Sequence, residues 1–263
     1  MTSHETKKQL NKEFSGLKYI LTSEMRTKLL LTIYEDSKNL DDLRNELEKP
    51  SATILHGLKE LENSNLVRKV HKHYELTSNG YLITTNMIKL IENWYSVNKS
   101  KVFWNNHDLS DIPDDVLKNV YMLKNARYIN STTSDLSNAL NAYLKEISKA
   151  RKLKIILPIY SENHFKHLIG LLNGDTLESL ELVISEELES SMRQNEYFKK
   201  SILKNEKVKI RTLKQKVKLF LTISEEFISL TLFFKDGHYD DSQILIAADN
   251  EALKWALNLS TYY

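Results

Sequence analysis

Residues 39–77 read NLDDLRNELEKPSATILHGLKELENSNLVRKVHKHYELT, and this stretch decides the fold of the first part of the chain. Leucines recur at helical spacing from Leu40 to Leu47, which predicts a short first helix. Pro50 ends this pattern, because the residue before a proline is disfavoured in the α conformation. The sequence therefore predicts a helix, a break and a second helix.

The second predicted helix has one apolar face and one polar face. Ser51 is expected to be its N-cap, and Ile54, Leu58 and Leu61 recur at i, i+4 and i+7. The other side of the helix begins at Ser51 and has short or polar side chains that fit a DNA major groove. These candidate DNA-contacting residues are Ser51, Ala52, Thr53, Leu55, His56 and Lys59.

A basic hairpin is predicted after this helix. Asn63-Ser64-Asn65 is expected to end the helix, since asparagine tolerates the left-handed conformation. Residues 66–70 and 74–77 then have the pattern of two strands. Positive charge at the tip suits contact with phosphates, although the same residues are also compatible with a solvated basic turn. The candidate phosphate contacts are Arg68, Lys69, His71, Lys72 and His73.

Residues 52–67, ATILHGLKELENSNLV, resemble the recognition helix and wing entry of archaeal and bacterial winged helix-turn-helix regulators of the ArsR/MarR-like type. On this resemblance Thr53 falls at the family's threonine, His56 at a position often held by arginine, and Lys59 at a basic or polar position. Leu55 replaces a usual serine, and we expect it to contact a thymine methyl instead. The resemblance implies a transcription regulator that binds double-stranded DNA. A winged helix that binds another protein, without sequence-specific DNA binding, is the alternative.

Helices are also predicted on both sides of this stretch. Ser23 is expected to cap a helix with its core stripe from Met25 to Ile33. After the hairpin, a long helix is predicted from about residue 80 to Phe103, with most of its apolar residues on one side. An apolar side of that length indicates burial against a second copy of the chain or against the next domain, and a homodimer would match a palindromic operator.

Composition limits the classes of function that remain. With 263 residues and a net charge of +2, the chain is long enough for two domains and can contact DNA only through local basic patches. It has no cysteine, which excludes disulfides and thiolate chemistry. No apolar run is long enough for a transmembrane helix. We therefore expect a cytoplasmic protein with no membrane partner.

The domain organisation is predicted from a polar stretch that closes at Pro113. We expect a winged helix-turn-helix at residues 1–80, a linker and dimerisation helix at 81–111, and an α/β sensor or oligomerisation domain at 112–263. In this last part, helical patterns alternate with short apolar runs, which predicts a largely parallel sheet. The helical patterns cover residues 113–122, 136–150, 161–172 and 186–203, and the apolar runs cover 126–130, 153–157, 180–185 and 208–213. Three successive strands from Lys218 to Ala247 predict an antiparallel meander that closes the sheet, and Asp249 is expected to cap a final helix at residues 249–259. The overall fold class is α+β / α/β with a mixed sheet.

The second half resembles the C-terminal α/β domain of archaeal regulators linked to methanogenesis, and it is distantly similar to the sensor half of TrmB-like regulators. The resemblance implies a role in sensing or oligomerisation. This arrangement is also similar to the phospholipase D fold, whose enzymes need a histidine, a lysine two residues later and an aspartate five residues after that. His164 and Lys166 match, but Leu171 stands at the third position.

The sequence therefore predicts no enzyme, no catalytic residues, no metal site and no cofactor, since other catalytic and nucleotide-binding motifs are also missing. His164 and His167 are interpreted as helix-surface histidines that face solvent or a neighbouring strand.

A binding site for a small anionic ligand is hypothesised where predicted strands end and helices begin, since helix N-termini offer unpaired N–H groups. The candidate ligand-binding residues are Ser131, Thr132, Thr133, Tyr160 and Ser161. Capping of the following helices by Ser134 and Ser161 is an equally good reading of these stretches. A protein partner at this domain, or a role only in dimerisation, also remains open.

Overall fold

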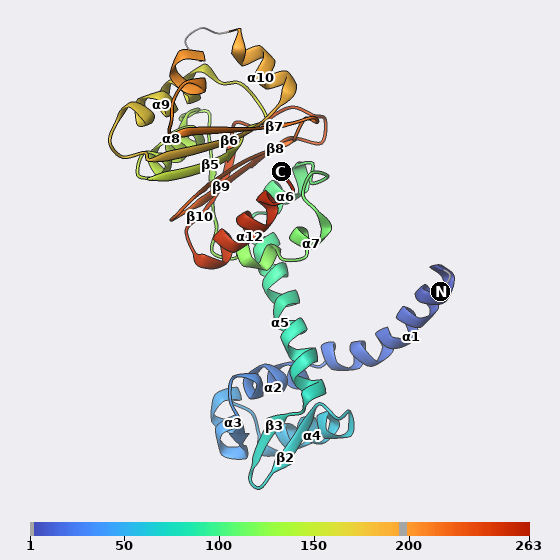
Figure 1. Cartoon of the computed structure of the whole chain (residues 1–263). Helices are drawn as coiled ribbons and strands as arrows, with labels where there is room; N and C mark the ends of the chain where they lie inside the picture. The colour runs from blue at the N-terminus through green and yellow to red at the C-terminus, as the bar shows by residue number, and fades with distance from the viewer. Residues whose placement is uncertain (1–2, 195–198) are drawn as a thin grey trace. The chain divides into compact units, whose positions relative to one another are not determined.

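The structure is a computed structural model that describes residues 3–194 and 199–263 (Figure 1). It divides into two compact units, Met1–Ile91 and Glu92–Tyr263. The boundary between the units lies inside helix α5 (Ser78–Lys99). The sequence analysis instead expected a separate linker and dimerisation helix at residues 81–111. The following residues belong to the second unit because Phe103 and Trp104 of α6 (Lys101–Asn106) are buried in its core.

The first unit consists of helices and a small antiparallel sheet. The helices are α1 (Ser3–Leu21), α2 (Glu24–Glu35), α3 (Leu40–Leu47), α4 (Ser51–Asn63) and the start of α5. The strands are β1 (Lys38–Asn39), β2 (Val67–Val70) and β3 (His73–Leu76), in the order β1-β3-β2. The predicted helices and hairpin are present, while α1 and the two-residue strand β1 were not expected.

Local capping explains where these elements begin and end. Asn39 accepts hydrogen bonds from the backbone N–H groups of Asp41 and Asp42, and the Asp42 carboxylate accepts one from the Asn39 backbone. This capping box starts α3. After α4, Asn65 has the expected left-handed conformation with a φ of 54°.

One expected cap is wrong. Pro50 is the N-cap of α4, with no side-chain cap hydrogen bond, and Ser51 is the first helical residue. The Pro50 carbonyl instead accepts hydrogen bonds from the backbone N–H groups of Thr53 and Ile54 at 3.0 and 3.2 Å. The helix therefore starts one residue earlier than the sequence predicts.

The second unit contains a seven-stranded mixed sheet among the described residues, in the order β4-β10-β9-β8-β5-β6-β7. The strands are β4 (Arg127–Asn130), β5 (Lys152–Ile156), β6 (Ser179–Ser185), β7 (Val208–Leu213), β8 (Leu219–Ser224), β9 (Ile228–Leu232) and β10 (Gln243–Ala247). Within the described part of this sheet, β5, β6 and β7 pair in parallel and the remaining pairings are antiparallel.

The mixed sheet is as expected, but the prediction of a largely parallel one is wrong. The antiparallel strands β8, β9 and β10 lie between β4 and β5, rather than closing one edge. The prediction followed from the alternation of helical patterns and apolar runs in the sequence. The buried runs of β8 and β9 instead take the centre, where both faces of the sheet are covered.

Helices cover both faces of the sheet and form two hydrophobic cores (Figure 1). Along β6, Leu180, Leu182 and Ile184 contribute to one core and Val183 to the other, as strand alternation requires. The first core includes α8 (Asn138–Ile147), α9 (Glu162–Asn173) and α10 (Glu186–Arg193). The second includes α6, α7 (Asp114–Leu117), η1 (Val120–Leu123) and α12 (Asn250–Ser260).

The helix expected over residues 186–203 is found as α10 and a short π-helical segment, η2 (Lys199–Leu203). Residues 195–198, which were expected to be part of it, lie outside the described residues. The final helix α12 agrees with the sequence, since the Asp249 side chain accepts hydrogen bonds from the backbone N–H groups of Glu251 and Ala252 at 3.0 Å.

Candidate nucleic-acid interface

Helix α4 buries one face and exposes the other. Ile54, Leu58 and Leu61 are at most 1% exposed and pack in the core of the first unit. Gly57 lies on the same buried side, where an added Cβ would be 2.8 Å from Leu29 Cδ1 on α2. Glycine at this position therefore lets α4 approach α2 closely.

The opposite face of α4 carries most of the side chains that the sequence singled out. Ala52, Thr53, Leu55, His56 and Lys59 are exposed, and Ser51 is half-buried. The face combines a hydroxyl, an imidazole, an ammonium and a leucine side chain within two turns of helix. Such a face can donate hydrogen bonds, accept them and make an apolar contact.

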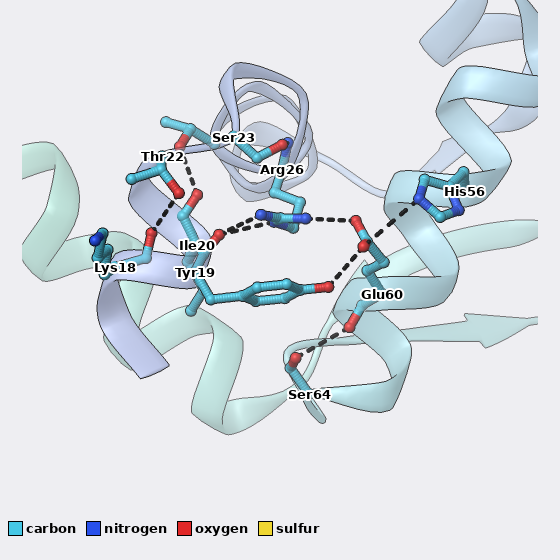
Figure 2. Close-up of polar contacts among 10 residues, drawn as sticks. Lys18, Tyr19, Ile20, Thr22, Ser23, Arg26, His56, Glu60 and Ser64 are labelled. Atoms are coloured by element: carbon cyan, nitrogen blue, oxygen red, sulfur yellow. Dashed lines mark hydrogen bonds and ion pairs between the residues drawn. The ribbon is translucent and has the colours of Figure 1, made fainter. Parts of the chain in front are cut away.

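A polar cluster connects α4 to α2 and to the end of α1, and Figure 2 shows how its side chains meet. Arg26 Nη1 donates a hydrogen bond to Glu60 Oε2 at 2.6 Å, and the Tyr19 hydroxyl donates one to Glu60 Oε1, also at 2.6 Å. The guanidinium lies 3.7 Å from the centroid of the Tyr19 ring and also donates to the Tyr19 carbonyl. These contacts fix Glu60 on the side of α4 next to its exposed face.

Glu60 in turn lies beside one of the candidate DNA-contacting residues. His56 Nε2 is 3.6 Å from Glu60 Oε1, one helical turn away (Figure 2). The hydrogen bond from Tyr19, followed by that from Arg26, lowers the pKa of Glu60, so its carboxylate stays ionised. This carboxylate favours an orientation of His56 along the helix surface.

The hairpin of β2 and β3 pairs Val67 with Leu76 and Val70 with His73. The turn is therefore His71-Lys72 alone, shorter than the expected three-residue tip, and His73 already belongs to β3. His71 has a φ of 56°, which is the left-handed conformation that such a tight turn requires. All five candidate phosphate contacts, Arg68, Lys69, His71, Lys72 and His73, are exposed.

The charges of this hairpin are not all equally available. Arg68 Nε donates a hydrogen bond to Glu75 Oε1 at 2.6 Å across the strands. Lys69 Nζ lies 5.3 Å from the centroid of the Tyr74 ring. Lys72 at the turn has neither an ion-pair nor a ring partner within residues 3–194 and 199–263. Glu75 lies outside the predicted tip, and the antiparallel register places it opposite Arg68.

Sequence reasoning also missed Tyr19 and Arg26. They come from segments before residue 39, and Arg26 precedes Glu60 by 34 residues, so neither spacing nor periodicity connects them. The N-cap of α2, in contrast, was predictable from the sequence. Ser23 accepts a hydrogen bond from the backbone N–H of Arg26 at 3.3 Å, as expected from the Ser23-Glu24 pair.

The structure separates the candidate ligand-binding residues of the second unit, since Ser161 lines a cavity beside α8 and α9 and Ser131 lines another hollow. Ser131 Oγ accepts a hydrogen bond from the Ala139 backbone N–H in the first turn of α8, and Ser161 Oγ accepts one from the His164 backbone N–H in α9. Both serines therefore satisfy helix donors, whereas Ser134 bonds the hydroxyl of Thr132 instead. Thr132 and Thr133 are exposed in the loop before α8.

Tyr160, the fifth of these residues, stacks on Phe165 with ring centroids 5.4 Å apart. Of the two environments expected for His164, solvent and a neighbouring strand, the structure shows the strand. His164 is buried, with its ring 5.3 Å from that of Phe220 on β8, so it faces a strand and not solvent. His167 is half-buried on the same helix.

Apolar side chains are exposed on two helices of the first unit. Leu10, Phe14, Leu17 and Leu21 recur along one side of α1. On α5, Leu82 and Leu90 are about 60% exposed. Trp94 and Tyr95 are also exposed on this helix, in the part that belongs to the second unit. None of the described helices has the length and hydropathy needed to span a membrane.

The structure defines a two-unit chain in which a small helical unit presents an exposed helix and a basic hairpin, and an α/β unit follows. Residues 14–94 match the family model of the N-terminal domain of the methanogenesis regulatory protein FilR1, and residues 136–263 match that of its middle domain. The chain therefore belongs to the family of proteins built from these FilR1 domains. The expected resemblance to methanogenesis-linked regulators is confirmed, whereas the ArsR/MarR-like subtype stays a prediction.

One curated relative is the methanogenesis regulatory protein FilR1 of Methanothrix harundinacea (strain 6Ac), which is 24% identical over 253 residues. The match covers 94% of this chain and 56% of the relative, so the chain spans little more than half of that protein.

Similar solved structures include TrmBL2, an archaeal chromatin protein, with a TM-score of 0.38 and 11% identity over 89% of both chains. Another is MepR, a transcription regulator of Staphylococcus aureus, with a TM-score of 0.29 and 19% identity. That match covers 39% of this chain and 80% of MepR.

Proposed function

We propose that this protein is a winged helix-turn-helix transcription regulator that binds double-stranded DNA with α4 in the major groove. The observation that carries the proposal is the division of α4 into a face at most 1% exposed and a face of exposed Thr53, Leu55, His56 and Lys59. A helix packed by one face can enter a groove without leaving the core. Membership in a regulator family supports the same function.

The hairpin supplies the second contact in this proposal. Phosphate contacts set the orientation of a protein on the duplex, and base contacts supply sequence preference. Lys72 and Lys69 at the turn and on β2 would contact phosphates, whereas Arg68 would first have to leave Glu75. We assign base contacts to Thr53, Leu55 and His56, with Ser51, Ala52 and Lys59 beside them.

A homodimer that binds a palindromic operator is the second part of the proposal. The apolar sides of α1 and α5 would be exposed in a monomer, and burial of apolar surface is the main driving force for association. A two-fold dimer would present two α4 helices to two half-sites. The second unit would then tune DNA affinity through a ligand or a protein partner.

The alternative is a winged-helix unit that binds an acidic protein partner and has no sequence preference for DNA. The basic turn at His71-Lys72 is compatible with either partner. The two functions differ in their requirement for the exposed face of α4, because a protein docked on the hairpin does not need Thr53 or His56.

Selection of genomic DNA fragments with the purified protein tests the proposal. We expect enrichment of a two-fold-symmetric site by the wild type and loss of enrichment by the triple variant Thr53→Ala, His56→Ala, Lys59→Ala. The matched control, Lys254→Ala with Asn258→Ala, changes exposed residues of α12 and should select the same site. Wild-type protein that enriches no sequence would contradict the proposal and favour the protein-binding alternative.

A further inference from the structure

The second unit contains a cavity of about 310 Å³ that none of the proposed DNA contacts uses. It lies between α8, α9 and the sheet, where β5 and β9 end, since Leu157 and Ile159 follow β5 and Thr231 is near the end of β9. Ligands of α/β sheets commonly bind outside the carboxyl ends of strands. The volume is at the lower end of the range for small-molecule sites.

Aromatic rings form much of the cavity wall. Phe220 on β8 is central to them, with its ring centroid 5.4 Å from that of Tyr143 and 5.3 Å from that of His164. Tyr239, in the loop before β10, lies 6.5 Å from Phe220. Leu140 of α8 contributes an apolar side chain to the same lining. Such an aromatic wall packs best against a flat aromatic ligand.

A buried polar group lies in this wall with unused hydrogen-bonding capacity. His164 is 3% exposed, and its Nε2 is 2.9 Å from the Tyr143 hydroxyl, which is also 3.2 Å from Thr222 Oγ1. The Nδ1 atom of His164 is buried and has no hydrogen-bond partner among the described residues. Buried polar atoms are rarely left without one. Because His164 belongs to the lining of the cavity, we infer that a ligand group in the cavity supplies the missing partner.

The two tautomers of His164 make different demands on the ligand group that bonds its Nδ1 atom. If Tyr143 donates to Nε2, Nδ1 carries the proton and needs an acceptor; if Tyr143 accepts from Nε2, Nδ1 needs a donor. A hydroxyl serves both cases because it donates and accepts. A ligand with a hydroxyl on an aromatic ring therefore fits either tautomer.

The described residues that line the cavity carry no fixed positive charge. Burial lowers the pKa of His164 to about 3, and burial raises those of Tyr143 and Tyr239 above their usual values, so all three are neutral near pH 7. Among the described residues that line the cavity there is no lysine or arginine, and Asp241 is exposed beside it. An anion would meet a carboxylate and no compensating cation, which argues against the anionic ligand expected from the sequence.

We propose that this cavity binds an uncharged aromatic molecule that carries a hydroxyl group. The rings of Phe220, Tyr143 and Tyr239 contact the aromatic body, and His164 exchanges a hydrogen bond with the hydroxyl. The site is separate from α4 and the hairpin, and its occupancy is measurable without DNA. Failure of ligand binding is therefore distinguishable from failure of the proposed DNA binding.

Titration of 2-naphthol with the full chain, followed by the fluorescence of the probe, tests the proposal. We expect saturable binding of one 2-naphthol per chain, with a dissociation constant on the order of 100 µM for so small a ligand. Naphthalene, which lacks the hydroxyl, should bind about tenfold more weakly. 2-Naphthoate, which is an anion of similar shape, should not bind at all.

Variants locate the binding in the cavity. Leu140→Trp places a larger side chain in the cavity from a residue that is 39% exposed, and it should abolish binding of 2-naphthol. The matched control Leu257→Trp, on the exposed side of α12, should bind as the wild type does. His164→Phe should bind naphthalene and 2-naphthol equally, since it removes the polar partner.

Three results would overturn the proposal. They are no saturable binding of 2-naphthol, binding of 2-naphthoate as tight as that of 2-naphthol, and undiminished binding by a folded Leu140→Trp chain. Circular dichroism establishes whether Leu140→Trp is folded. If it is not, the His164→Phe comparison decides, because a persistent preference for 2-naphthol over naphthalene would equally contradict the assignment.

Discussion

Arg26 on α2 donates a hydrogen bond to Glu60 on α4 at 2.6 Å, and the pair joins the exposed helix of the first unit to the helix behind it. The side chains are only 12% and 22% exposed, so the pair is partly shielded from solvent. Glu60 also accepts from Tyr19 and lies beside His56. The position of the proposed DNA-contacting face therefore depends on residues that do not themselves belong to it.

Replacing Arg26 by methionine should weaken DNA binding although Arg26 is not a proposed DNA contact. The change leaves Glu60 without its cationic partner, and a partly buried carboxylate without a partner favours displacement of α4. We expect a lower Tm and a loss of affinity of several-fold for the selected DNA site, measured by fluorescence anisotropy. Glu24→Gln, which breaks an exposed pair with Lys28, is the control and should change neither quantity. Unchanged affinity in Arg26→Met would show that this cluster does not position α4.

Charge reversal at the hairpin turn should change the salt dependence of DNA binding. Lys72→Glu removes a cation at the turn, so the slope of log K against log salt should become less steep by about 1. Arg68→Gln should have a smaller effect, because Glu75 already neutralises much of that charge. Lys28→Glu, on the exposed side of α2, is the control. Equal slopes for Lys72→Glu and the wild type would exclude the hairpin turn from the phosphate contacts.

Gly80→Ala should strongly destabilise the first unit. A Cβ at Gly80 would lie 1.9 Å from the backbone oxygen of Leu66, where neither group is at the end of a flexible side chain. We expect a loss of about 3 kcal/mol in the free energy of unfolding, measured by urea denaturation. Gly170→Ala in α9 has open space around the new methyl group and should gain about 1 kcal/mol. A neutral Gly80→Ala would contradict the close approach of α5 to the entry of the hairpin.

Acid should destabilise the second unit through His164. Burial, and to a smaller extent the charge of His167, lowers the pKa of His164 to about 3 in the folded chain, against 6.5 for the unperturbed group. Between these values the unfolded state binds a proton that the folded state does not, so stability falls as pH decreases from 6.5. The loss approaches about 1.4 kcal/mol per pH unit.

The His164→Leu variant isolates this contribution. Its free energy of unfolding should depend less on pH between 6.5 and 5 than that of the wild type, measured by urea denaturation of the full chain. His73→Leu, which changes an exposed histidine of the hairpin, should keep the wild-type dependence. A wild-type slope retained in His164→Leu would show that the buried imidazole does not titrate with folding.

The first unit could be predicted from the sequence because its signals are local. Leucine spacing, Pro50 and Asn65 place α3, α4 and the hairpin within a residue or two of their observed bounds. The contacts that could not be predicted join residues far apart in the sequence. Tyr19 and Arg26 contact Glu60 from 41 and 34 residues away, and no periodic pattern links them. The pairing of Arg68 with Glu75 needed the register of the hairpin, which follows from a turn shorter than expected.

The second unit was predicted element by element but not in its sheet order. The apolar runs give the strands β4 to β10, yet a buried run fits an edge or a centre equally well, so the central position of β8 and β9 was not predictable. The cavity depends on that order, because it brings Phe220, Thr231 and His164 together from separate parts of the chain. Local serine-rich stretches suggested a ligand site at Ser131 and Ser161, where the hydroxyls cap helices instead.

The central claim is that the exposed face of α4 binds DNA by sequence, and equilibrium titration of the selected duplex at 50 and 200 mM salt tests it most directly. We expect wild-type affinity to fall on the order of 100-fold or more between the two conditions and to exceed that for a scrambled duplex at both. The Thr53→Ala, His56→Ala, Lys59→Ala variant should bind both duplexes equally. Equal binding of the two duplexes by wild type and variant, with little salt dependence, would contradict the account.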